Sequence, residues 1–282
     1  MSEDENRQQV REGYAKVAVE QSSCCGGSTT HDESRRVGYS EAELGTIPEG
    51  ANMGLGCGNP VALASLRAGE TVIDLGSGGG LDCLLAAKKV GKSGRIIGVD
   101  MTPEMLDKAR RNARLGNYSN VEFRLGEIEN LPVADNSVDV VMSNCVINLT
   151  TNKKRVFEEA FRVLKPGGRV MISDLVLSKE LPPELRKRID PTSCVTGATL
   201  KDKYLDTIKA AGFQDVNVME EKQYYYEDLA SDPNSTVVVL NAKTSVAETK
   251  KVSELDEETR RKARLQVENV SSISVSATKP RR

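Results

Sequence analysis

The stretch ETVIDLGSGGG, residues 70–80, decides the fold class of this chain. It begins with a short apolar run that predicts a buried β-strand, and it ends in a glycine-rich turn. The next residues, LDCLLAAKKV (81–90), have helical spacing, so the turn joins a strand to a helix. In an open α/β sheet, ligands bind outside the carboxyl ends of the strands, where this turn lies. The stretch therefore predicts both a fold class and the position of a binding site.

The alternation of strand and helix continues after this stretch. Further strands are predicted over residues 95–100, 120–126, 138–144 and 168–177, and helices over 102–115 and 152–164. Such alternation is typical of a doubly wound, Rossmann-like α/β sheet with parallel strands. Beyond residue 177 the pattern predicts an α+β region, with helices over 182–213 and 250–264, β-prone stretches over 214–226 and 235–248, and a final strand over 271–280. The pairing of residues 230–282 stays open.

Composition and charge argue against several kinds of partner. The 282 residues suffice for one α/β domain with an appendage, and 38% of them are hydrophobic. The 39 basic and 41 acidic side chains nearly balance, which argues against binding to nucleic acid or to an anionic membrane. Residues 1–21 lack the apolar core of a secretory signal, and no apolar run reaches the roughly 18 residues that cross a bilayer. We expect a cytoplasmic monomer with mostly reduced thiols.

The glycine-rich turn, DLGSGGG at 74–80, predicts a cofactor site. Asp100 ends the next strand, where a carboxylate can accept hydrogen bonds from both ribose hydroxyls. A dinucleotide site of the G-x-G-x-x-G type would need glycine at position 81, where this chain has Leu81. The form D-x-G-x-G-x-G instead resembles motif I of the class I S-adenosylmethionine-dependent methyltransferases. GEIENLP (126–132) and Val138-Asp139 resemble later motifs of that family.

This resemblance implies a set of residues that bind S-adenosylmethionine. Ile128 would lie beside the adenine, Glu129 would hold its amino group, and the backbone of Gly76 would approach the methionine part. The full set expected at the cofactor is Asp74, Gly76, Ser77, Gly78, Asp100, Met101, Ile128, Glu129 and Asn144. The alternative is an ordinary glycine-rich turn without a ligand. Residues that resemble binding motifs stand at three predicted strand ends, and this agreement argues against the alternative.

The six cysteines are the second informative feature of the sequence. Cys57 lies in a glycine-rich loop, GLGCGNP (54–60), ahead of a predicted helix whose positive N-terminus favours a thiolate. Cys145 follows the fourth predicted strand, Cys194 lies in a loop after a helix, and Cys83 sits among apolar residues of the first helix. We expect Cys83 to be a small core residue, a reading that position alone also leaves open for the others. A structural zinc site is not expected, because the chain has no C-x-x-C pair.

Five segments resemble the arsenite methyltransferase family: residues 38–66, 72–87, 96–106, SNCVINL (143–149) and SCVTGA (193–198). The resemblance covers about residues 10–215 and the last strand. It implies that Cys57, Cys145 and Cys194 bind trivalent arsenic. It also implies that an upstream cysteine, Cys24 or Cys25, cycles through a disulfide. Eukaryotic members carry tyrosine where this chain has Leu55, so the packing around the methyl group is expected to differ.

The resemblance further implies a mechanism. Soft thiolates suit a thiophilic centre, and arsenic held by three thiolates keeps a lone pair that attacks the methyl group of S-adenosylmethionine without a base. Enzyme thiols, for example Cys57 with Cys24 or Cys25, would then reduce the arsenic and become a disulfide. Thioredoxin or a small thiol would restore them.

These inferences divide the chain into three regions. We predict a flexible N-terminal segment with the cysteine pair (1–39), a Rossmann-like domain that binds S-adenosylmethionine and contains the GLGCG loop (40–180), and an arsenic-binding C-terminal region (181–282). Two other functions remain open at this point. One is a carbon or oxygen methyltransferase of the quinone-biosynthesis type, and the other is a non-catalytic sensor of As(III) or of thiol redox state.

Overall fold

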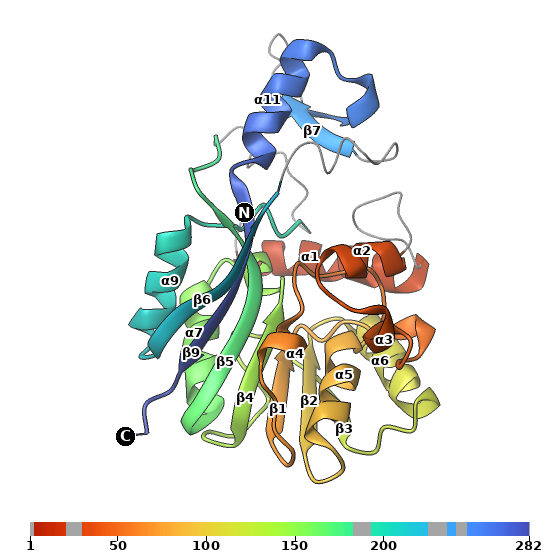
Figure 1. The fold of residues 1–282 in the computed structure, drawn as a ribbon, viewed down its shortest axis with the longest axis vertical. Helices are drawn as coiled ribbons and strands as arrows, with labels where there is room; N and C mark the ends of the chain where they lie inside the picture. The colour runs from red at the N-terminus through yellow and green to blue at the C-terminus, as the bar shows by residue number, and fades with distance from the viewer. Residues whose placement is uncertain (1–2, 21–29, 183–192, 225–235, 241–246, 282) are drawn as a thin grey trace.

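A seven-stranded sheet forms the centre of the molecule, with helices on both of its faces (Figure 1). The structure is a computed structural model that describes residues 3–20, 30–182, 193–224, 236–240 and 247–281. The strand order is β3-β2-β1-β4-β5-β9-β6. The strands span β1 Thr71–Leu75, β2 Arg95–Asp100, β3 Val121–Leu125, β4 Val138–Asn144, β5 Leu164–Leu177, β6 Gln214–Gln223 and β9 Val270–Thr278.

The pairing of the strands confirms the predicted doubly wound, Rossmann-like fold class. Strands β3, β2, β1, β4 and β5 pair in parallel. Strand β9 lies between β5 and β6 and runs antiparallel to both. After β1 the chain first builds the side with β2 and β3, and it then returns to place β4 on the other side of β1. Ligands bind at such a switch point, outside the carboxyl ends of the strands.

Each face of the sheet has its own layer of helices and its own buried cluster. The helices span α1 Glu3–Glu20, α2 Thr30–Arg36, α3 Glu41–Leu44, α4 Pro60–Leu63, α5 Leu81–Val90, α6 Pro103–Leu115, α7 Lys153–Val163, α9 Lys201–Ala210 and α11 Glu257–Val267, with short 3₁₀ turns η1 Glu49–Ala51, η2 Ile147–Leu149 and η3 Val252–Glu254. On β1, Val72 belongs to the cluster that contains α5 and α6, whereas Ile73 belongs to the one that contains α7 and α9. Both faces of β1 are thus covered, as expected of a continuous apolar run.

A second, small sheet resolves part of the pairing that the sequence leaves open. Strand β7 (Thr236–Leu240) pairs antiparallel with β8 (Ala247–Lys251). In Figure 1 this hairpin and α11 lie beyond the carboxyl ends of the central strands. Among the described residues, no helix combines the length and the apolar character that a membrane span requires.

Helix α1 lies within the segment 1–39, for which the sequence predicts flexibility. The segment is polar, so the apolar periodicity that identifies a helix is weak there. Among the described side chains of α1, only Val10 and Ala18 are buried. The helix packs against α6, and such tertiary contacts stabilise most helices in proteins.

The start of β5 and the extent of the central sheet both differ from the prediction. Strand β5 begins earlier than the predicted residue 168, because Leu164 pairs with Val138 before the register shifts and Arg169 pairs with Val140. Strands β6 and β9 belong to the central sheet. The sheet therefore continues across the boundary that the sequence predicts after residue 180.

A buried carboxylate ties α7 to the segment that follows β3. Glu159 is only 1% exposed. It accepts hydrogen bonds from the backbone N–H of Leu131 (2.8 Å), from Arg155 (3.0 Å) and from Arg162 (2.7 Å). A buried charge of this kind is tolerated only while its partners remain, and loss of one side of such a pair costs about 3–5 kcal/mol.

We expect Glu159→Ala to lower the free energy of unfolding by about 3 kcal/mol, because it leaves the buried N–H of Leu131 without its acceptor and removes one of the two carboxylates that Arg162 binds. Urea unfolding monitored by circular dichroism measures the change. Glu158→Ala is the matched control on the same helix, since Glu158 makes only exposed ion pairs and its loss should cost less than about 1 kcal/mol. Equal losses for the two variants would contradict the assigned role of Glu159.

Candidate functional site

A cavity of about 440 Å³ opens at the carboxyl ends of β1, β2 and β4. Its walls come from the loops after these strands and after β3, from the loop at residues 53–57, and from α1. The cavity is lined by every residue that the sequence predicts at the cofactor: Asp74, Gly76, Ser77, Gly78, Asp100, Met101, Ile128, Glu129 and Asn144. Cys57, Cys145 and Cys194 line the same cavity. The fold thus brings together residues that are far apart in the sequence.

The turn after β1 needs glycine for both its conformation and its contacts. Gly76 has a φ of +70°, and its N–H donates to the carbonyl oxygen of Val99 on β2 (2.8 Å). A Cβ atom on Gly76 would lie 2.4 Å from the side chain of Val146, which follows β4. The turn after β1 therefore rests directly on the turn after β4.

Polar groups of this turn are arranged around the cavity. Asp100, at the end of β2, accepts from the N–H of Gly78 (2.9 Å) and from the N–H of Thr102 (2.8 Å). The hydroxyl of Ser77 is buried and has no hydrogen-bond partner among the residues that the structure describes. A buried hydroxyl of this kind needs a partner, so the turn fits a ligand with polar groups.

The opposite end of the cavity lies beneath α1. Ile128 is buried there, and the hydroxyl of Thr150 donates to the carboxylate of Glu129. Helix α1 is held over this end by Asn6, whose side chain donates to the carbonyl oxygen of Leu149 (3.1 Å). The sequence does not predict α1 as a wall of the site, because contacts between segments so distant in the chain leave no local pattern.

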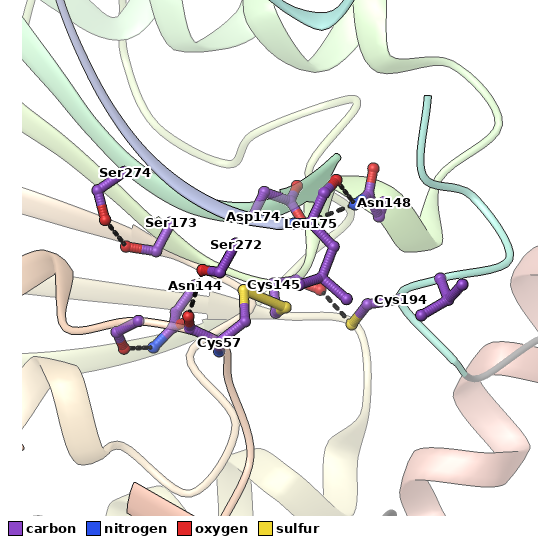
Figure 2. Close-up of a disulfide and its surroundings, with 12 residues drawn as sticks. Cys57, Asn144, Cys145, Asn148, Ser173, Asp174, Leu175, Cys194, Ser272 and Ser274 are labelled. Carbon is purple, nitrogen blue, oxygen red and sulfur yellow. Dashed lines mark hydrogen bonds between the residues drawn. A yellow bond between two sulfur atoms is a disulfide. The ribbon is translucent and has the colours of Figure 1, made fainter. Parts of the chain in front are cut away.

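Cys57, Cys145 and Cys194, which line the cavity, lie close together in one cluster (Figure 2). The structure joins Cys57 and Cys145 in a disulfide, with Cα atoms 5.8 Å apart. Cys194 lies outside this disulfide, and its thiol donates to the carbonyl oxygen of Cys145 (2.8 Å). Cys24 and Cys25, the predicted redox cysteines, lie outside the described residues, so their pairing with Cys57 stays a prediction.

The backbone at Cys145 has an unusual conformation. Its φ is +60°, a value that side-chain-bearing residues rarely adopt. The N–H of Cys145 donates to the carbonyl oxygen of Ser173 on β5 (2.8 Å). The chain thus leaves β4 in a sharp turn at this residue. Such outliers persist where the surroundings determine them, and they cluster at functional sites.

Asp174 lies beside the two bonded sulfurs, a position that the sequence does not predict. One of its carboxylate oxygens and the sulfurs of Cys57 and Cys145 all lie within 4.8 Å of one another. The carboxyl group accepts from Tyr204 (3.0 Å) and from Asn148 (2.8 Å), and burial raises its pKa to about 7. The residue stands inside the predicted strand 168–177, where alternation marks it only as one more buried position.

Two buried carboxylates line the cavity near the turn after β1. Burial raises the pKa of Asp74 well above its ordinary value, and the neighbouring charge of Asp82 raises it further. Burial also raises the pKa of Asp82, to about 6, against hydrogen bonds from Tyr39 and Asn144 that lower it. Cys83 is fully buried, as the sequence predicts, and its thiol donates to Asp74 (3.3 Å).

Comparison with known proteins identifies similar sequences. A family model described as a methyltransferase domain matches residues 66–212. The chain is 47% identical, over 246 residues, to an arsenite methyltransferase of Halobacterium salinarum, an alignment that covers 81% of this chain and 63% of that protein. It is 37% identical, over 235 residues, to an arsenite methyltransferase of Aquipseudomonas alcaligenes, covering 78% of this chain and 66% of that protein. The chain thus spans slightly less than two thirds of the length of these relatives.

A solved structure is similar in both fold and sequence. It is the crystal structure of an arsenic(III) S-adenosylmethionine methyltransferase from Chlamydomonas reinhardtii. The match has a TM-score of 0.57 and 30% sequence identity, and it covers 90% of this chain and 74% of that one. Because this match covers 90% of the chain, the similarity extends beyond residues 66–212, which the family model matches.

We expect Asp82→Asn to make the free energy of unfolding less dependent on pH. The pKa of Asp82 is about 6 in the folded protein, whereas an unfolded aspartate titrates at about 3.9. The folded state keeps a proton that the unfolded chain releases. The stability that Asp82 contributes is therefore full below about pH 4 and is lost as the pH rises through about 6. The loss should amount to roughly 3 kcal/mol in the wild type.

Urea unfolding at a series of pH values measures this dependence. Asp107→Asn serves as the control, because the Asp107 side chain is 75% exposed and its replacement should leave the pH dependence unchanged. If the free energy of unfolding of Asp82→Asn depended on pH as strongly as that of the wild type, the pKa assigned to Asp82 would be contradicted.

Proposed function

We propose that this chain, which belongs to the arsenite S-adenosylmethionine methyltransferase family, transfers methyl groups from S-adenosylmethionine to trivalent arsenic. The observation that carries the proposal is the single cavity lined both by the glycine-rich turn at Gly76 and by Cys57, Cys145 and Cys194. Arsenite and methylarsenite would be the substrates. A thiophilic acceptor requires thiol ligands, and the cavity brings them next to the cofactor turn.

The residues at the turn fit S-adenosylmethionine. The unpartnered hydroxyl of Ser77 and the open space at Gly78 leave room for a polar ligand on the backbone. Asp100 would hold the ribose, and Ile128 and Glu129 would hold the adenine. When bound, S-adenosylmethionine supplies a methyl group carried on a positively charged sulfur. The buried carboxylates of Asp74 and Asp82 would stabilise the positive charge of the methionine part.

The cysteines would do the remaining chemistry by holding the acceptor. Arsenic bound by three thiolates keeps its lone pair, so no side chain has to remove a proton from the nucleophile. The enzyme then contributes mainly position and exclusion of water. The apolar residues around the thiols, Leu175, Leu181 and Val270, support this role because they are buried with them.

Each methyl transfer oxidises arsenic formally from the trivalent to the pentavalent state. Two thiols return the two electrons, release two protons and become a disulfide. We propose that Cys57 takes part, with Cys24 or Cys25 as the expected partner, and that thioredoxin or a small thiol reduces the disulfide. The Cys57–Cys145 disulfide supports a role for Cys57 in thiol–disulfide chemistry, with Cys145 as a second candidate partner. A reducing compartment such as the cytoplasm suits this cycle.

Incubation of the purified protein with S-adenosylmethionine, arsenite and a thiol, followed by arsenic speciation, tests the proposal. We expect methylated arsenic species to form. Cys57→Ser, Cys145→Ser and Cys194→Ser should each lower the methylation rate at least about 100-fold. A hydroxyl oxygen is a poor ligand for arsenic, and an acceptor displaced from the methyl group reacts about this much more slowly.

Cys83→Ser is the matched control. Cys83 is buried away from the cluster, and a serine hydroxyl can keep the hydrogen bond to Asp74, so its activity should stay close to wild type. The alternatives give other results. A quinone-type methyltransferase would tolerate the cysteine changes and form no methylarsenicals, and a sensor would bind arsenite without turnover.

A further inference from the structure

The carboxamide of Asn144 clamps the backbone of the loop that carries Cys57. Asn144 is the last residue of β4. Its Oδ1 accepts from the N–H of Cys57 (2.9 Å), and its Nδ2 donates to the carbonyl oxygen of Gly58 (2.8 Å). One side chain thus holds the N–H of Cys57 and the carbonyl group of the residue that follows it. The sequence predicts Asn144 at the cofactor, but these contacts point to the thiols.

The loop lies directly against this carboxamide. A Cβ atom on Gly56 would come within 2.7 Å of Nδ2 of Asn144, so only glycine allows the approach. From the other side, the hydroxyl of Ser272 on β9 donates to the carbonyl oxygen of Cys57 (2.5 Å). The backbone of Cys57 is therefore fixed at both its N–H and its C=O groups.

Tyr39 and Asp82 determine which way the carboxamide points. The hydroxyl of Tyr39 donates to Oδ1 of Asp82 (2.6 Å), so its oxygen is left to accept from Nδ2 of Asn144 (2.9 Å). Nδ2 also lies 3.2 Å from Oδ2 of Asp82. A flipped carboxamide would turn its oxygen toward three acceptors and its NH₂ group toward the N–H of Cys57. The flip is therefore repelled on both sides.

We propose that Asn144 is a positioning residue: oriented by Tyr39, it holds the backbone of Cys57 where the Cys57 thiol meets that of Cys145. Because Cys145 follows Asn144 directly in the chain, one residue places both thiols, the first by its side chain and the second by its backbone. As a statement about arsenic binding, the inference rests on the proposed function. Its test uses the disulfide and needs neither arsenic nor cofactor.

Equilibration of the full-length protein in glutathione redox buffers, with isotope-coded alkylation and peptide mass spectrometry, measures the equilibrium constant of the Cys57–Cys145 disulfide. In Asn144→Asp, a carboxylate faces the oxygens of Gly58, Tyr39 and Asp82, so the clamp breaks. We expect the equilibrium constant to fall at least about tenfold, equivalent to about 30 mV in reduction potential. Tyr39→Phe removes only the orienting hydroxyl and should cause a smaller fall in the same direction.

Asn120→Asp is the matched control. Asn120 also binds two backbone carbonyls, those of Ala87 (3.3 Å) and Gly91 (2.9 Å), but it lies away from the cysteines. Its change should leave the disulfide constant at the wild-type value, even if thermal stability falls. A merely structural role for Asn144 would give Asn144→Asp the same result as this control.

Wild-type constants in both Asn144→Asp and Tyr39→Phe would overturn the inference. If Asn144→Asp does not fold, Tyr39→Phe alone decides between the two outcomes. Arsenite binding, followed by the near-ultraviolet absorbance of arsenic–thiolate bonds, is the second measurement and should weaken in the same order. Failure of the wild type to bind arsenite would count against the proposed function, whereas the disulfide comparison would still test Asn144.

Discussion

The contact between the turn after β1 and the turn after β4 is the constraint on which the site depends. Gly76 approaches Val146 so closely that a side chain at position 76 has no room. Since Val146 follows Cys145, the backbone that faces the cofactor and the backbone that carries a thiol form one packed unit. In the proposed reaction, the packing of the Val146 side chain against Gly76 thus helps to set the distance between methyl donor and acceptor.

The cysteine thiols are soft ligands, and buried polar groups surround them. Asp174 lies within 4.8 Å of both sulfurs of the disulfide, and Asn144 and Ser272 hold the backbone of Cys57. Buried polar groups of this kind are costly unless they are satisfied, and satisfied networks rigidify a site. The cluster is therefore expected to present its sulfurs in a defined arrangement, with apolar residues such as Leu175 keeping water away.

Most of the parallel sheet could be predicted from the sequence, because apolar runs and glycine turns are local signals. The turn at 74–80 and the carboxyl ends of β2 and β4 lie where those signals place them. The meeting of Cys57, Cys145 and Cys194 needed the family resemblance, since no spacing rule links residues so far apart. Asp174 and α1 escaped prediction for opposite reasons. Asp174 is one buried position in an apolar strand, whereas α1 is mostly polar and has few buried residues.

The position of β9 has a consequence for how the molecule is made. Strand β9 pairs with β5, yet residues 178–269 separate the two strands in the chain. At a synthesis rate of about 5–20 residues per second, a nascent chain leaves the edge of β5 unpaired for several seconds. During that interval Ser272 is absent and the loop of Cys57 lacks one of its two anchors. Newly synthesised molecules therefore pass through a stage in which the open edge of β5 and the thiols of the proposed site are exposed together.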